Sequence, residues 1–198
     1  MKRLNHSRCR INDCAYVVAI SLGLNILGSQ AVTYLQLPAF LDSTGTILAA
    51  VLLGPLFGSL VGLLTNLIEG FFIYSGLYYF AIVNILIGLV TGVIFKKYPF
   101  NVKYVVITTI ILALIGTIVG NIIAYYLFGG ITGSPIDDIT IYLVSSGMSV
   151  YNAVFVSGFI INLFDKIISF VLVFVIIGFF QKYVDKCYLN IKFDDKTN

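Results

Sequence analysis

Residues 39–70 read AFLDSTGTILAAVLLGPLFGSLVGLLTNLIEG, and this stretch predicts the fold of the chain. Proline lacks the N–H that would continue a helix but suits the first turn of a new one, so Gly54-Pro55 predicts a turn between two apolar helices. Asp42 and its Ser and Thr neighbours begin the first helix, while Asn66 and Glu69 end the second. Folding at this turn therefore brings both polar ends to one membrane face.

Small residues recur at helical spacing within the second of these helices. Gly54, Gly58 and Gly62 are four residues apart, which gives the helix a groove for close packing against another helix.

The composition predicts an integral membrane protein. The chain has 198 residues, of which 59% are hydrophobic and only 11% charged, and its mean hydropathy is +1.01, far from the values of soluble domains. The net charge of +3 gives no indication of a nucleic-acid partner, because in a membrane protein the placement of positive charges matters more than their sum.

Six apolar runs are long enough to form helices in a hydrocarbon core about 30 Å thick. They lie at 13–33, 39–54, 55–74, 79–95, 104–128 and 153–182. The expected fold is therefore an all-α, multi-pass protein of the cell membrane. It has a basic leader at 1–12, a single six-helix membrane domain at 13–182 and a charged tail at 183–198.

The positive-inside rule orients these spans. Lys and Arg cluster before the first span, at 96–103 between the fourth and fifth spans, and after the sixth. An even number of crossings separates the clusters, so both termini are expected in the cytosol. The longest outer segment, 129–150, has no Lys or Arg, carries Asp137 and Asp138, and is long enough to act as a cover.

With this topology, the intramembrane polar residues converge on the outer leaflet. The candidate substrate-binding residues are Asp42, Asn66, Glu69, Asn84, Asn121, Tyr125, Asp165 and Lys166. Ionisable groups in a bilayer cost several kcal/mol unless they face a cavity or a partner, so a polar pocket is expected here.

Each candidate also has a structural interpretation. Asp42 is as well placed to cap its helix as to contact a ligand, and Asp165 could cap a shortened last span while Lys166 snorkels. The three Asn side chains could be interhelical hydrogen-bonding groups worth roughly 0.6 kcal/mol each. Tyrosines near the outer face fit an interfacial belt, although at least one could stack on a flat ligand.

Ala15, Ala19 and Gly23 form a second ladder of small residues, in the first span, which is expected to dock on a partner helix. No phosphate loop, zinc-protease motif or nucleophile elbow is present, so the sequence predicts neither an enzyme nor a cofactor. His6 is the only histidine, and the cysteines lack metal-ligand spacing, so no metal site is expected.

The chain resembles the substrate-binding S component of energy-coupling factor (ECF) transporters. The resemblance rests on LLGPLFGSLVGLLTN at 52–66, LDSTGT at 41–46, the Ala15/Ala19/Gly23 ladder and NLFDK at 162–166. It implies that the ladder docks on a membrane T component, that two cytosolic ATPases drive transport, and that substrate sits in the outer half under the outer loops.

The resemblance leaves the substrate open. Family members for nickel or cobalt begin with a His-containing ligand sequence, and MKRLNHSRC does not, which favours a water-soluble vitamin or related heterocycle. Three carboxylates against one lysine suit a neutral or cationic group. The alternatives are a free-standing carrier, for which an inverted repeat would be expected, and a membrane sensor, for which a fused signalling domain would be expected.

Overall fold

A computed structural model describes residues 11–134 and 136–179, and all regular secondary structure in these ranges is helical. The helices are α1 (Ile11–Tyr34), α2 (Thr44–Leu53), α3 (Pro55–Phe72), the 3-10 helix η1 (Ser75–Phe80), α4 (Ala81–Lys97), α5 (Val102–Ile115), the π-helical turn η2 (Gly116–Gly120), α6 (Asn121–Phe128), α7 (Asp137–Ser145) and α8 (Val150–Phe179). The predicted tail and most of the predicted leader lie outside the described residues.

Within the described ranges, five stretches are long and apolar enough to cross a membrane. They are α1, α3, η1 with α4, the continuous α5–η2–α6 segment, and α8. The all-helical, multi-pass prediction is confirmed, but six full spans are not. The predicted span 39–54 is helical only from Thr44, and α2 has ten residues.

The predicted hairpin at Gly54-Pro55 is confirmed. Leu53 ends α2 and Pro55 begins α3, while Gly54 between them has a φ of 95°, a conformation that side chains other than glycine rarely adopt. The α3 helix buries one face and exposes the other. Its exposed residues are Leu56, Leu60, Leu67, Phe71 and Phe72, and the first four recur at helical spacing as expected for a lipid-facing stripe.

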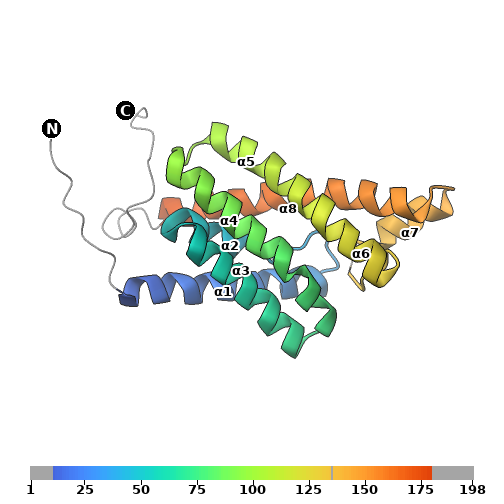
Figure 1. Cartoon of the computed structure of the whole chain (residues 1–198), viewed down its shortest axis with the longest axis horizontal. Coiled ribbons are helices and arrows are strands. Elements are labelled where there is room, and N and C mark those ends of the chain that lie inside the picture. Colours follow the sequence, from blue (N-terminus) through green and yellow to red (C-terminus); the bar gives the residue numbers. More distant parts are fainter. Residues whose placement is uncertain (1–10, 135, 180–198) are drawn as a thin grey trace.

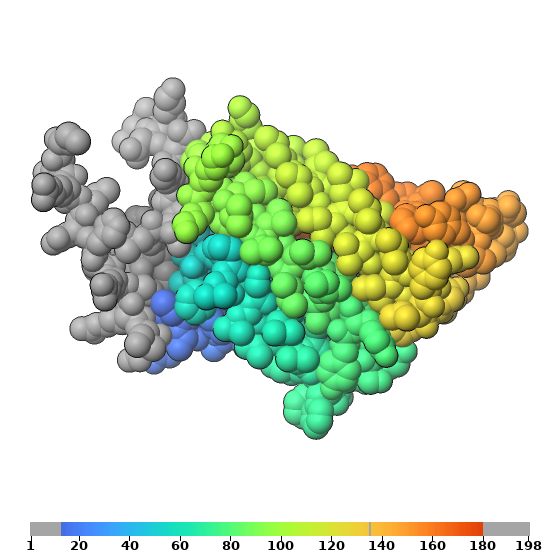
Figure 2. Space-filling view, in the orientation of Figure 1, coloured from blue at the N-terminus to red at the C-terminus, as the bar shows by residue number. Residues whose placement is uncertain are grey.

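The helices form an elongated bundle with two distinct ends (Figure 1). The first turn of α1, the α4–α5 connection and the last turn of α8 lie at one end, and α7 lies at the other. Figure 2 shows that α3, α4 and the α5–η2–α6 segment form one continuous face of the molecule. This arrangement is compatible with the predicted topology, although the orientation relative to the cytosol stays a prediction.

A hydrophobic core fills the half of the bundle nearest the α4–α5 connection. Phe95 belongs to this core, with its ring centroid 5.0 Å from that of Phe100 and 6.1 Å from that of Phe170. Ile47, Val51 and Leu52 of α2 belong to the same cluster. This half of the protein is closed by packed side chains.

Two sets of small residues have different environments. A Cβ atom on Gly88 would collide with the backbone of Gly58, so α3 and α4 approach closely there. By contrast, Ala15 and Ala19 are exposed, and a Cβ on Gly23 would meet nothing within 4 Å. The glycines of α3 and α4 are thus interior packing positions, and the α1 ladder lies on the surface.

Candidate functional site

A cavity of about 260 Å³ lies between the helices on the α7 side of the hydrophobic core. Its walls come from α1, the connection before α2, α3, η1, α4, η2, α6, the connection before α7, α7 itself and α8. The cavity therefore lies where the sequence predicted a polar pocket, in the half of the bundle expected to face outward.

One wall is polar and combines α3, α4 and the connection before α2. The Nδ2 of Asn84 donates to the Oδ1 of Asn66 at 2.8 Å and to the backbone carbonyl of Asp42 at 3.2 Å. Asn66 in turn donates to the carbonyl of Leu77 at 3.0 Å. The two Asn residues are both interhelical hydrogen-bonding groups and part of the cavity wall, so the two interpretations of these residues are compatible.

The two acidic residues of this wall have neutral partners. The Ser29 hydroxyl of α1 donates to the carboxylate of Glu69, whose side chain is only 2% exposed. The Oδ2 of Asp42 lies 3.4 Å from the Nδ2 of Asn84. Ser43, rather than Asp42, is the N-cap of α2, so the capping alternative for Asp42 is wrong.

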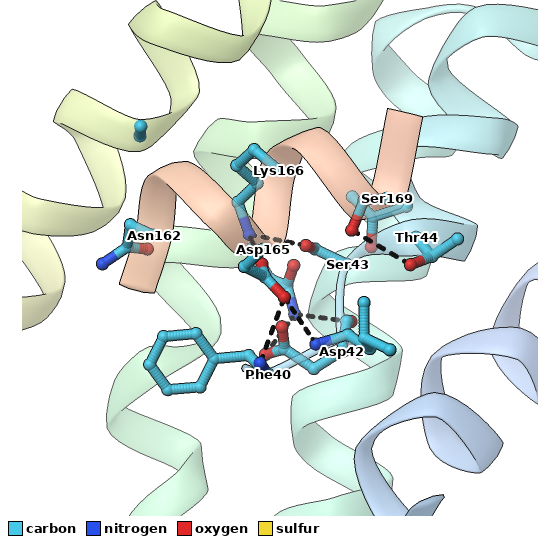
Figure 3. A network of polar contacts seen from close by, with 12 residues as sticks. Phe40, Asp42, Ser43, Thr44, Asn162, Asp165, Lys166 and Ser169 are labelled. Atoms are coloured by element: carbon cyan, nitrogen blue, oxygen red, sulfur yellow. Dashed lines mark hydrogen bonds and ion pairs between the residues drawn. The ribbon is translucent and has the colours of Figure 1, made fainter. Parts of the chain in front are cut away.

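A buried ion pair lies beside this wall (Figure 3). The Nζ of Lys166 is 2.5 Å from the Oδ2 of Asp165 and donates to the hydroxyl of Ser43 at 2.7 Å. The Oδ1 of Asp165 accepts the N–H groups of Phe40 and Leu41 at 3.1 and 2.7 Å. The pair therefore fastens α8 to the segment before α2.

This geometry corrects two interpretations of the pair. Asp165 is in the interior of α8, which runs on to Phe179, and so does not cap a shortened helix. Lys166 is 2% exposed and does not snorkel. Lys166 lines the cavity, whereas Asp165 lies behind the wall and holds the backbone that shapes it.

The opposite wall is built by η2, α6 and α8. Asn121 donates from Nδ2 to the carbonyl of Val154 at 3.0 Å, and Asn162 donates to the carbonyl of Gly158 at 2.8 Å. Both Asn residues line the cavity. Tyr125 does not: its ring packs edge-on against Tyr126 and Tyr151 instead.

The connection before α7 contributes residues to the cavity lining. The carboxylate of Asp137 accepts the backbone N–H groups of Thr132 at 3.0 Å, Gly133 at 2.6 Å and Ser134 at 3.1 Å. Thr140 of α7 and Ser157 of α8 share a hydrogen bond of 2.8 Å. The segment that the sequence indicated as a cover thus has an ordered turn and its own helix.

Of the eight candidate binding residues, six line the cavity: Asp42, Asn66, Glu69, Asn84, Asn121 and Lys166. The candidate binding residues did not include Ser29, Asp137 and Asn162, which also line the cavity, although Asn162 was expected among the polar residues in the outer part of the last span. The available signals were a polar residue in the outer half of α1, an acid after a Gly-Ser-Pro turn, and an Asn four residues before Lys166. Among the described residues, no group of three His, Cys, Asp or Glu side chains could hold a metal ion.

The apolar part of the cavity includes three aromatic side chains, Phe40, Tyr74 and Phe80. Phe80 stacks on Phe128 with ring centroids 5.8 Å apart, so it is held in place from the side of α6. Aromatic faces beside a few oriented polar groups are the usual lining of a small-molecule site.

The fold is that of a multi-pass membrane protein with a cavity among its helices. A family model for the substrate-specific component of ECF transporters matches residues 16–177. This match covers most of the chain, which therefore belongs to that family of membrane-embedded transport subunits. No curated protein and no solved structure matches the chain.

Proposed function

We propose that this chain is the high-affinity binding subunit of an ECF-type importer for a water-soluble vitamin or a related small heterocycle. The observation that carries the proposal is the cavity between the helices, whose polar groups come from helices far apart in the sequence. A volume of about 260 Å³ is close to the lower end of small-molecule sites, which favours a ligand of one or two rings.

The proposed contacts follow from the cavity lining. Asp42, Glu69 and Asn84 offer polar groups on one wall, and Asn121 offers an amide on the other. Tyr74 supplies an aromatic face on which a flat ring can stack. Asp165 and Tyr125 have supporting roles in this proposal, because neither lines the cavity.

The proposed partners are a membrane T component and two cytosolic ATPases. The chain contains no phosphate-binding loop of its own, so ATP hydrolysis has to be supplied in trans. Ala15, Ala19 and Gly23 leave an open strip on α1 where a partner helix can approach closely. These residues are the proposed docking surface.

The test starts from small molecules retained by the purified protein in detergent, identified by mass spectrometry. The identified ligand, in labelled form, is then offered to proteoliposomes that contain this chain alone or with its coupling subunits. We expect binding without accumulation by the chain alone, and ATP-dependent accumulation by the complex. ATPase subunits with a substituted phosphate-loop lysine are the control and should abolish accumulation while sparing binding.

The alternatives give different results in the same experiment. Concentrative uptake by the chain alone would establish a free-standing carrier. Binding without uptake in either preparation would favour a membrane sensor.

A further inference from the structure

One wall of the cavity carries two carboxylates with no cation of their own. Asp42 and Glu69 both line the cavity, and their hydrogen-bond partners are the Asn84 amide and the Ser29 hydroxyl, which are neutral. At this site, Lys166 forms its salt bridge with Asp165. The charge of Lys166 is therefore already balanced by Asp165, 2.5 Å away.

The charge balance of the site is negative. When ionised, Asp42, Asp165 and Lys166 together carry one net negative charge, and Glu69 adds a second. The remaining acid of the lining, Asp137, accepts three backbone N–H groups and is occupied in shaping the cover. A carboxylate or phosphate ligand would meet like charge at this wall, where burial limits screening by water.

The hydrogen-bond donors of the same wall are also occupied. The Nδ2 of Asn84 has three acceptors within reach, on Asn66 and Asp42, for its two hydrogens. Ser29 donates its hydroxyl hydrogen to Glu69. The Oδ1 of Asn84 is a buried acceptor with no hydrogen-bond partner in the described part of the chain, and this side chain is only 2% exposed. The wall is thus rich in acceptors and poor in available donors, and buried acceptors need donors.

We infer that the ligand carries a protonated amine, an amidine or an amino-substituted nitrogen ring, and that this group binds the wall formed by Asp42, Glu69 and Asn84. Its N–H groups supply the donors that the wall lacks, and its positive charge offsets the two carboxylates. The adjoining ring lies against Tyr74 and Phe80, at the aromatic side of the cavity. This inference rests on the proposed function and narrows its substrate class.

The test uses three probes with one ring and different charges: aminomethylpyridine, pyridine carboxamide and pyridine carboxylate. Each is added to the purified full chain in detergent, and its Kd is measured by thermal shift and calorimetry. We expect the cationic probe to bind at least roughly tenfold more tightly than the anionic one, with the neutral amide between them.

Two variants remove the charges with little change in shape. Glu69→Gln keeps an oxygen that can accept from Ser29, and Asp42→Asn changes the second carboxylate from a different segment, so misfolding of one variant leaves the other informative. In each we expect the preference for the cationic probe to fall by roughly tenfold. Asp138→Asn is the matched control, because Asp138 is exposed and outside the cavity lining; its preference should equal that of the unmodified protein.

Several outcomes would overturn the inference. Equal or tighter binding of the carboxylate probe, no binding of any probe, or an unchanged preference in both variants would each contradict it. If the ligand retained by the purified protein is an anion and the complex accumulates it, the inference is also overturned, while the proposed function stands. If the protein retains no small molecule and the complex accumulates none, the proposed function fails as well.

Discussion

At the scale of single residues, the Asp165–Lys166 pair explains the shape of the site. An ion pair in the membrane interior is costly unless its remaining hydrogen-bonding capacity is satisfied. Here the Oδ1 of Asp165 accepts two backbone N–H groups, and Lys166 also donates to Ser43. These contacts hold Leu41 at a φ of 52°, which is uncommon for a branched, bulky side chain.

Replacing Asp165 with Asn should destabilise the protein, because it leaves Lys166 buried without a counter-charge. Removing one partner of a buried pair costs about 3–5 kcal/mol. We expect a clear fall in the midpoint of thermal unfolding in detergent. The double variant with Lys166→Met should recover part of this loss, since no unpaired charge then remains.

The control for this experiment is Lys96→Met, which removes an exposed lysine and should leave the midpoint nearly unchanged. If the double variant were as unstable as the sum of its two single changes, the pair would not be coupled as described.

Sequence reasoning placed most of the polar lining correctly in space but could not assign every side chain. Asn121 and Tyr125 are four residues apart and were expected on one face, yet only Asn121 lines the cavity. Two residues four apart point in directions that differ by about 40° around the helix axis. The ring of Tyr125 also packs against Tyr126 and Tyr151, outside the cavity. The direction of a single side chain depends on its packing contacts, and these cannot be read from the spacing of residues in the sequence.

At the scale of helices, the Gly54-Pro55 pair made the turn between α2 and α3 predictable from sequence. The length of α2 was not predictable, because it depends on contacts with residues far along the chain. Gly54-Pro55 is a local signal and gave the turn at the right residues. The late start of α2 depends on Asp165, which lies far along the chain and binds the N–H groups of Phe40 and Leu41. The sequence did not anticipate α7 or the π-helical turn η2.

The glycines packed between α3 and α4 and the Ala15/Ala19/Gly23 ladder on α1 should respond differently to added bulk. Gly88→Ala forces a Cβ atom into the backbone of Gly58, so we expect a lower unfolding midpoint. Ala19→Phe adds bulk to an exposed position on α1, so we expect an unchanged midpoint but loss of assembly with the T component and of uptake. Thermal unfolding and co-purification measure the two effects.

Gly23→Ala provides a control for the first change, because a Cβ atom there meets nothing within 4 Å and the fold should be unaffected. Normal assembly of Ala19→Phe with reduced stability would instead mean that the α1 ladder is an internal packing surface.

At the scale of the whole molecule, topology is the property on which every functional assignment depends. Single cysteines at Asp138 and at Lys103, in a variant without the native thiols, should react with an impermeant reagent from opposite sides of the membrane. Both positions are exposed. Asp138 belongs to α7 and Lys103 to the first turn of α5, and these two elements lie toward opposite ends of the bundle (Figure 1). We expect Asp138→Cys to label in intact cells, and Lys103→Cys only after the membrane is opened.

A cysteine in place of Ala113, which is fully buried, is the negative control for both conditions. Reversed labelling of the two exposed positions would invert the protein and place the cavity on the cytosolic side.

The short length of α2 bears on the depth of the proposed site in the membrane. Ten residues at about 1.5 Å each make a helix of about 15 Å, half the thickness of a hydrocarbon core of about 30 Å. Its far end lies against α4, because Gly92 of α4 packs on Pro55 one turn before Lys96. Under the proposed function, a solute held against Asp42 is therefore expected about half-way across the hydrocarbon core, with the packed layer that includes Phe95 on its cytosolic side.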